Sequence, residues 1–523
     1  MNNNEIIAKY LPANTDIKIH NNFLTFEITH ALLKEIVCDL YRKHNLPLKI
    51  ITATDERGEN GCFKIFYVFG VPKENVFLAP FIRIESSEEF PSLTSEIHEA
   101  STYERKIKTF FGLDPKGHPN PRALILHENW PQGVFPLRKD FNWQTRPAEA
   151  KEHFEFYKID GEGIYEIPVG PIHAGIIEPG HFRFNVAGEE ILNLEPRLGF
   201  VHKGSEKLFE VLPLEKKLIL SEKISGDSAF SHSLAFCQAA ESLGGINVPE
   251  RAKYLRVVYA EMERLVNHLG DIGAIMLDTG FSFGGANGSR LREMVMQINE
   301  RLTGSRFLRG VNIFGGVAKD IDKQTAEKLI EDLENIVNDF SEVIEVAENS
   351  DSLLNRLKGT GIISSQIAKD HGVTGVAGRA GGAKNDARID FSYAAYDKLD
   401  FQVAMEESSD VYARFRVRIK EVYSSFEIIK QALANMPEGA INAQASEVNL
   451  KQSSFAVGIA EGWRGDIVYF TITDANGNIS RVDVRDPSFL NWTAAGHAGP
   501  GNIVPDFPLI NKSFNLSYSG NDL

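Results

Sequence analysis

Three long stretches with apolar residues at helical spacing constrain the fold of this chain more than any other feature. The first begins near Val248, the second spans about residues 326–347, and the third spans about residues 410–435. Apolar residues three or four positions apart form one face of an α-helix. In the third stretch this face consists of Val411, Phe415, Ile419, Val422, Phe426, Ile429 and Leu433. Three such helices predict an α-helical bundle core.

The N-terminal part has a different pattern, which predicts a small α/β domain over residues 1–145. Residues 48–54, 62–71 and 77–84 have the β-branched and aromatic composition of strands. The polar run 55–61, which contains two glycines, separates the first two of them and indicates a hairpin.

A charged segment that contains Pro147 follows this domain and predicts a linker over residues 146–160. The remaining domain, residues 161–523, combines the long helices with short strands. These are a hairpin over 185–194 and strands at 467–473 and 479–484. The expected fold class is therefore α+β, with a small α/β domain followed by a mainly α-helical bundle domain with short β-sheets.

Two glycine-rich runs interrupt the helical part. Residues 281–289 predict a loop, and because no Lys-Ser or Lys-Thr pair ends the run, a phosphate-binding loop is disfavoured. Residues 372–382 fit either a mobile loop or close backbone packing around a buried pocket. In the second interpretation Arg379 lies near that pocket.

Charge and cysteine content exclude several classes of function. The 523 residues carry a formal net charge of −15, which argues against a nucleic-acid-binding surface. The N-terminus lacks the basic and apolar segments of a signal peptide, and no stretch has the roughly 18 apolar residues of a membrane span. Only Cys38, Cys62 and Cys237 occur, so this chain is not expected to hold an iron–sulfur cluster alone.

Residues 221–232 carry a pattern that resembles the metal-binding segment of nickel–iron hydrogenase large subunits. In that family the pattern is Cys-Gly-x-Cys followed by His-Ser; here Ser225-Gly226-Asp227-Ser228 is followed by His232-Ser233. The second cysteine pair of the family corresponds to Ser517 and Gly520. A thiolate binds nickel and iron because it is soft and easily deprotonated, and a serine hydroxyl is neither. The resemblance therefore implies a frame without a nickel–iron centre.

Other segments extend this resemblance over nearly the whole chain. Glu104-Arg105, Gly112-Leu113, His118-Pro119 and Trp130-Pro131 resemble a peripheral-arm subunit of respiratory complex I. Residues 199–208 and the run 372–382 resemble the hydrogenase large subunit and its relative, the quinone-site subunit of complex I. The chain is thus identified as similar to a formate hydrogenlyase-type large subunit fused to the peripheral-arm module.

The resemblance implies a set of site residues. Either His173 or His181 corresponds to the proton-donating histidine of complex I, Asp278 to the aspartate paired with it, and Ser225 to its tyrosine. Asp227 is new to the pattern and is interpreted as a proton carrier with a raised pKa or as a helix cap. The pocket set is Ser225, Ser228, Ser517 and Arg379, and the face toward a partner's cluster holds His202, Lys203 and Glu206. No metal ligand is expected.

The function that the resemblance implies is that of a subunit of a membrane-associated oxidoreductase, similar to NADH:quinone oxidoreductase, and not that of a functional hydrogenase. The chain would form an acceptor pocket for a quinone-like molecule beside an iron–sulfur cluster of a small partner subunit, and would couple electron transfer to ion translocation by membrane-embedded subunits. The expected location is cytoplasmic, on the inner face of the cell membrane. The alternative is a non-catalytic scaffold or conformational-coupling subunit of an ion-translocating complex.

Overall fold

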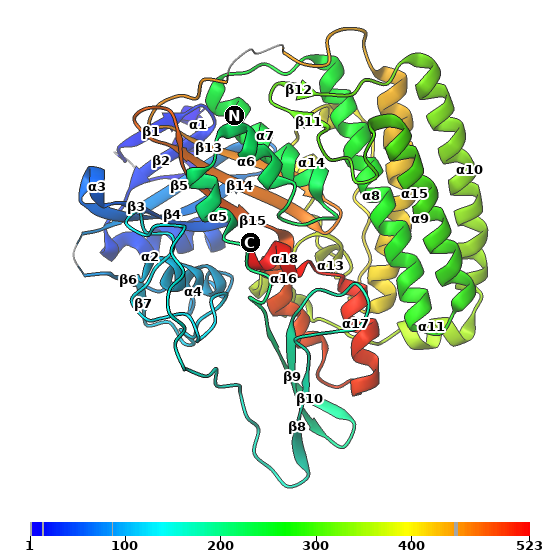
Figure 1. Ribbon diagram of the computed structural model, residues 1–523, viewed down its shortest axis with the longest axis horizontal. Helices are drawn as coiled ribbons and strands as arrows, with labels where there is room; N and C mark the ends of the chain where they lie inside the picture. The colour runs from blue at the N-terminus through cyan, green and yellow to red at the C-terminus, as the bar shows by residue number, and fades with distance from the viewer. Residues whose placement is uncertain (1–2, 13–14, 86, 444–447) are drawn as a thin grey trace.

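The computed structural model describes residues 3–12, 15–85, 87–443 and 448–523 (Figure 1). Its N-terminal part is a five-stranded sheet with strand order β1-β2-β5-β4-β3, antiparallel except for the parallel pair β2–β5. The strands are β1 (Ile17–His20), β2 (Phe23–Glu27), β3 (Leu48–Glu56), β4 (Cys62–Val71) and β5 (Val76–Ile84). The predicted strands and the hairpin between β3 and β4 are confirmed.

This sheet is covered on both faces, which explains why its central strands are apolar almost without alternation. The helices α2 (His30–Cys38) and α4 (Ala100–Phe111) contact it. So does a C-terminal sheet, β13 (Phe455–Gly462), β14 (Gly465–Thr473) and β15 (Ile479–Arg485), which in Figure 1 lies beside the blue strands. The rings of Phe66 and Phe470, one from each sheet, lie 5.5 Å apart. Residues far apart in sequence therefore share one hydrophobic core.

The helical part is built around α8 (Glu250–Asp278), which is buried on nearly all sides. It packs against α9 (Ser282–Thr303) and α15 (Val411–Asn435), while α10 (Lys323–Glu348) covers the outer side of α9 and α15 (Figure 1). The three helices predicted from apolar spacing, now α8, α10 and α15, are confirmed. In the part of the chain that the structure describes, no helix combines the length and apolar character that a membrane span requires.

The prediction of a loop over residues 281–289 was wrong, because this run forms the first turns of α9. Its glycines serve helix packing. A Cβ on Gly288 would lie 2.5 Å from Cα of Gly273 on α8, so the two backbones meet directly at this point. Glycine composition signals a loop only where the backbone needs unusual dihedral angles, and here it signals close approach.

The remaining elements connect these parts. The predicted hairpin over 185–194 is confirmed as β9 (His181–Ala187) and β10 (Glu190–Arg197), which form a three-stranded sheet with β8 (Ile164–Val169). No helix or strand lies between Lys116 and Ile164. The other elements are α1 (Asn3–Tyr10), η1 (Asp39–Lys43), α3 (Arg57–Asn60), β6 (Glu89–Pro91), β7 (Asp114–Lys116), β8 (Ile164–Val169), β9 (His181–Ala187), β10 (Glu190–Arg197), α5 (Ser205–Val211), α6 (Leu214–Ser221), α7 (Ala229–Gly244), β11 (Asn312–Ile313), β12 (Gly316–Val317), α11 (Asp351–Leu357), α12 (Ser365–Asp370), α13 (Gly375–Arg379), α14 (Ala387–Asp390), η2 (Tyr396–Lys398), α16 (Pro487–Ala495), η3 (Gly496–Ala498), η4 (Val504–Asp506), α17 (Phe507–Phe514) and α18 (Tyr518–Asp522).

Candidate functional site

The serines that replace the family cysteines lie together in the fold. Ser225 lies in the turn between α6 and α7, and Ser517 is the N-cap of α18. Although 292 positions separate them in sequence, their Oγ atoms are 2.8 Å apart, and both residues are buried. Ser517 Oγ also accepts a hydrogen bond of 2.9 Å from the backbone N–H of Gly520. The segments around Ser225 and Ser517 thus form one polar surface, the serine wall.

Asp227 forms a bidentate ion pair with Arg464, with both oxygen–nitrogen distances at 2.7 Å. The guanidinium stacks on the Trp463 ring, 3.8 Å from its centroid, and its Nε donates to the carbonyl of Asn515. Burial alone would raise the pKa of Asp227, but Arg464 more than offsets it and holds that pKa below its usual range. The expected raised pKa was therefore wrong, and the side chain makes no cap bond to α7.

A cavity of about 650 Å³ opens in front of this wall. The predicted residues that line it are His173, Ser225, Asp227, Asp278 and Ser517. His173 is therefore the histidine on the cavity, and its Nε2 lies 2.7 Å from the carbonyl oxygen of Gly180. His181 is absent from the lining and instead packs against Phe156. Ser228 is buried behind Asp227 and does not line the cavity.

The expected pairing of His173 with Asp278 is absent, since no hydrogen bond or ion pair joins them among the described residues. Asp278 is the last residue of α8. Burial raises its pKa and the nearby Lys512 opposes this, so the carboxyl binds a proton more readily than an ordinary aspartate. The two groups therefore face the same cavity as separate polar groups.

A histidine–aspartate pair that sequence reasoning missed lies behind the serine wall. His232 Nε2 is 3.0 Å from Asp486 Oδ2, and its Nδ1 is 3.0 Å from the Tyr469 hydroxyl. A Cβ on Gly520 would lie 2.6 Å from Cγ of Asp486, so the fourth cysteine position has no room for a side chain. His232 was recognised only as part of a motif. The residues around His232 and the serines come from distant parts of the chain: Tyr469 from β14, Asp486 from the turn after β15, and Arg464 from the turn before β14. No local sequence pattern links these three residues to His232.

Arg379 does not line this cavity. It is fully buried in an ion-pair network, with its Nε 3.0 Å from Glu421 and its Nη1 2.7 Å from Glu461. The run 372–382 does pack closely against a pocket, but against a different one of about 570 Å³. The prediction that Arg379 lies on the cavity of the serines was therefore wrong. A resemblance along the sequence does not indicate on which side of β13 and β14 a segment packs.

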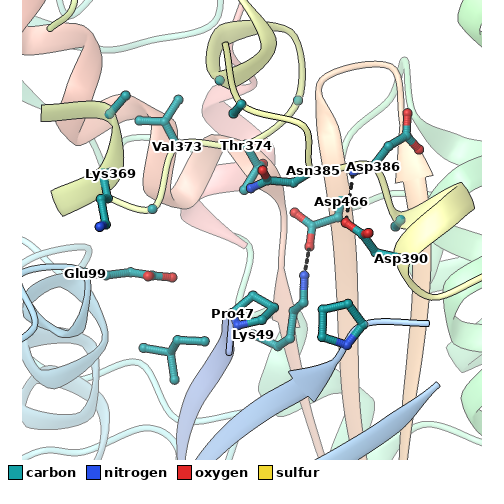
Figure 2. Close-up of a pocket in the computed structure, with 18 of the residues that line it drawn as sticks. Pro47, Lys49, Glu99, Lys369, Val373, Thr374, Asn385, Asp386, Asp390 and Asp466 are labelled. Atoms are coloured by element: carbon teal, nitrogen blue, oxygen red, sulfur yellow. Dashed lines mark hydrogen bonds and ion pairs between the residues drawn. The ribbon is translucent and has the colours of Figure 1, made fainter. Parts of the chain in front are cut away.

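This second cavity lies between the N-terminal sheet and the glycine-rich run (Figure 2). Lys49 reaches from β3 to Asp466, at 2.9 Å, and so connects the two parts of the molecule. Glu99 faces the same space, and burial raises its pKa to about 7. None of the serines at the cysteine positions lines it. The first cavity, which collects them, is therefore the candidate site.

The three residues expected to face a partner's cluster divide into two groups. Lys203 is exposed and donates to the carbonyl of Ile224, next to the serine wall, and His202 is half-buried with its Nδ1 2.6 Å from the carbonyl oxygen of Asp522. Glu206 instead points inward to Lys106 at 3.0 Å and Arg481 at 3.2 Å, so its assignment to a partner-facing surface was wrong. The residue lies on the side of α5 that packs against β15.

The residues at the former metal positions do not fit a nickel–iron centre. They offer three hydroxyls, of which those of Ser225 and Ser517 bond to each other, and a glycine with no side chain. The Arg464 cation lies beside them, its Nη1 3.4 Å from Ser225 Oγ and 3.5 Å from Ser228 Oγ. Soft, anionic sulfur ligands are what such metals need. Across the described ranges, no group of three or more His, Cys, Asp or Glu side chains is placed to hold a metal ion.

Comparison with known proteins shows which family the chain belongs to. Residues 26–147 match the family described as respiratory-chain NADH dehydrogenase, 30 kDa subunit, and residues 278–457 match the 49 kDa subunit family. Formate hydrogenlyase subunit 5 of Escherichia coli is 33% identical over 506 residues, covering 95% of this chain and 89% of that protein. The chain belongs to this family of fused hydrogenase-type and NADH dehydrogenase-type large subunits.

Members of the family include hydrogenase-4 component G of Escherichia coli, which is 32% identical over 95% of this chain and 88% of its own length. A solved structure, that of the membrane-bound sulfane sulfur reductase, an archaeal respiratory membrane complex, contains a similar chain. It superposes with a TM-score of 0.65 at 26% identity, over 70% of this chain and all of that one. The expected family and the α+β fold class are therefore confirmed.

Proposed function

We propose that this protein is the large subunit of a membrane-associated, complex I-like oxidoreductase, and that it binds an electron acceptor in the 650 Å³ cavity beside an iron–sulfur cluster of a small partner subunit. The observation that carries the proposal is the convergence of Ser225, Ser517 and Asp278 on one cavity at the position where related hydrogenases hold their metals. Without metals at this position the cavity is open, and polar groups that face a cavity are satisfied by a ligand or by water.

The cavity combines a polar part and an apolar part, as a site for a quinone-like acceptor requires. Its inner end is polar, with the serine wall and the Asp227–Arg464 pair, and it can hydrogen-bond a carbonyl oxygen. Phe182, Ile176 and Phe507 line other parts. Ile172 and Ile176, on the loop before β9, are 78% and 99% exposed, a surface that fits an apolar partner or a hydrophobic tail. Small-molecule sites commonly combine an apolar lining with a few polar groups.

In this proposal the partner's cluster supplies electrons and the chain supplies protons. Asp278, with its raised pKa, is the group that can donate a proton to the reduced acceptor, and His173 lies on the same cavity. The association with a membrane complex is inferred from relatives such as the archaeal respiratory membrane complex. The partner's cluster and the ion coupling are inferred from the resemblance to complex I.

The test uses the purified complex. Its reduced cluster is mixed with a short-chain quinone, and cluster reoxidation is followed by stopped-flow absorbance. Asp278→Asn should slow proton-coupled turnover about 10²-fold, the order of effect of one general acid, without loss of subunits from the complex. Asp351→Asn, an exposed aspartate at the start of α11, is the control. Unchanged turnover in Asp278→Asn would contradict the assigned role.

A scaffold without a redox ligand is the second candidate, because the Ser225–Ser517 and Asp227–Arg464 pairs satisfy one another inside the chain. A scaffold predicts no reoxidation of the cluster by any quinone, and no effect of Asp278→Asn on ion transport. Quinone reduction that depends on Asp278 is incompatible with it.

A further inference from the structure

Two cations on the wall of the candidate cavity make no hydrogen bond or ion pair with any residue that the structure describes. Arg292 on α9 and Lys512 on α17 both line the cavity and both are half-buried. No hydrogen bond or ion pair within the described ranges involves either side chain, whereas Arg464 and Arg418 nearby are bonded to Asp227 and Asp271. Removing a cation from water without a counter-ion costs free energy, so an unpaired cation facing a cavity favours an anion there.

The position of Arg292 depends on a glycine. A Cβ on Gly270 would lie 2.6 Å from Arg292 Cδ and 3.1 Å from its Nε, so the arginine stem lies flat on the bare backbone of α8. Gly270 itself lines the cavity. Contact with α8 therefore restricts the arginine stem at the cavity wall, instead of leaving it free to extend into solvent.

None of the acids that line the cavity forms an ion pair with Arg292 or Lys512 in the part of the chain that the structure describes. Asp227 and Asp271 are paired with arginines, and Glu178 accepts the backbone N–H of Ser519. Asp278 has no hydrogen-bond or ion-pair partner among the described residues; burial raises its pKa, and the Lys512 charge lowers it. A ligand that enters the cavity meets Arg292 and Lys512 as donors that make no hydrogen bond or ion pair within the described ranges.

We propose that Arg292 and Lys512 form an anion-binding subsite, and that the acceptor taken by this cavity carries a negatively charged oxygen or sulfur group. The proposal rests on the proposed function, because it names the class of acceptor for the same cavity. Arg292 is the main contact, since its planar guanidinium can bind two acceptor atoms at once, and Lys512 adds a point charge.

The test compares two probes with the same ring system, 1,4-naphthoquinone and its anionic derivative 1,4-naphthoquinone-2-sulfonate. Binding of each to the purified complex is measured by isothermal titration calorimetry. The sulfonate should bind more tightly than the neutral quinone, and Arg292→Gln should weaken the sulfonate about tenfold while changing the neutral probe less than about twofold, as expected for loss of one charge pair. Lys512→Gln should act in the same direction but less.

Two further variants separate charge from packing. Arg292→Lys keeps the positive charge and should retain most of the preference for the sulfonate. Arg290→Gln removes an arginine from the same helix that is exposed and paired with Asp339 at 2.8 Å, so it should change neither affinity.

The outcomes separate this proposal from the function on which it rests. Equal weakening of both probes by Arg292→Gln, or no preference for the sulfonate in the unaltered complex, would overturn the anion subsite and leave the acceptor cavity standing. Failure of both probes to bind would overturn the subsite and the acceptor function together.

Discussion

At the residue scale, a buried ion pair holds one cation next to the candidate cavity. Arg464 lies beside the serines at the cysteine positions and is held by Asp227, Asn515 and the face of Trp463. Its side chain is 5% exposed, whereas that of Asp227 is 35% exposed. Asp227 is therefore the counter-ion of a buried cation, and this explains why an acid occupies the variable position of the former cysteine motif.

Removal of that counter-ion should destabilise the fold. Asp227→Ala leaves Arg464 buried without an anion, and because the aspartate is partly solvated we expect a loss of about 1–2 kcal/mol, less than for a fully buried pair. Asp227→Asn keeps hydrogen bonding and should cost less. Urea unfolding of the full chain measures both, and a midpoint unchanged in Asp227→Ala would show that the ion pair does not contribute.

Glu99 makes stability depend on pH. Its folded pKa of about 7 lies above the ordinary value of 4.5, so the folded state holds the proton more tightly. The stabilisation is complete below about pH 4.5 and is lost as pH rises toward 7, by up to about 3 kcal/mol. Glu99→Gln should remove this contribution and flatten the curve of unfolding free energy over that range. An identical slope in the variant and the unaltered chain would contradict the assignment.

At the element scale, α8 organises the site because glycines let neighbouring groups approach it. Gly270 accommodates Arg292, and Gly273 accommodates Gly288 of α9. The polar residues that face the cavity, Asn267, Asp271 and Asp278, lie on the same helix at spacings near one or two turns. One rigid helix thus contributes both to the core and to the cavity wall.

Gly288→Ala tests this close packing. Alanine normally stabilises a helix by about 1 kcal/mol relative to glycine. Here its Cβ would lie 2.5 Å from Cα of Gly273, so we expect a net loss of about 1–3 kcal/mol, typical of overpacking. Ala286→Ser, at an exposed position of the same helix, should stay within about 0.5 kcal/mol. Thermal unfolding distinguishes the two signs, and a stabilised Gly288→Ala would rule out direct backbone contact.

At the scale of the whole molecule, the N-terminal sheet and the C-terminal sheet share a core. Val457, Phe470 and Phe489 belong to the same hydrophobic cluster as Phe23 and Phe66. Buried ion pairs cross the same boundary, from Lys49 to Asp466 and from Lys106 to Asp483. The two parts therefore depend on each other for burial of apolar surface.

A fragment that ends at residue 145 should fail to fold cooperatively. It would expose the sheet face now covered by β13–β15, and loss of that contact removes a large part of the apolar burial of a small domain. We expect binding of a hydrophobic dye and no sharp thermal transition, compared with the full chain under the same conditions. A monomeric fragment with a single sharp transition would show that the sheet has a sufficient core alone.

The sequence by itself determined the family and the elements with a strong local pattern. Apolar spacing predicted α8, α10 and α15 because a helix face is a local, periodic property, and β-branched runs predicted β3, β4 and β14 for the same reason. The loss of the cysteines was also legible, since the chemistry of a thiolate belongs to one side chain and does not depend on its neighbours.

Only the tertiary structure decided which residues meet. It separated His173 from His181, left His173 and Asp278 unpaired among the described residues, and removed Arg379 from the cavity. It also formed a different pair, His232–Asp486, from residues that do not line the cavity. The pKa of Asp227 is lowered and not raised, because Arg464 pairs with it in the fold. The two residues lie 237 positions apart in sequence, so the pair could not be predicted from a local motif. Ion pairs and close glycine contacts form between segments that the shared core brings together. Because these segments are distant in sequence, neither periodicity nor a local motif predicts the contacts.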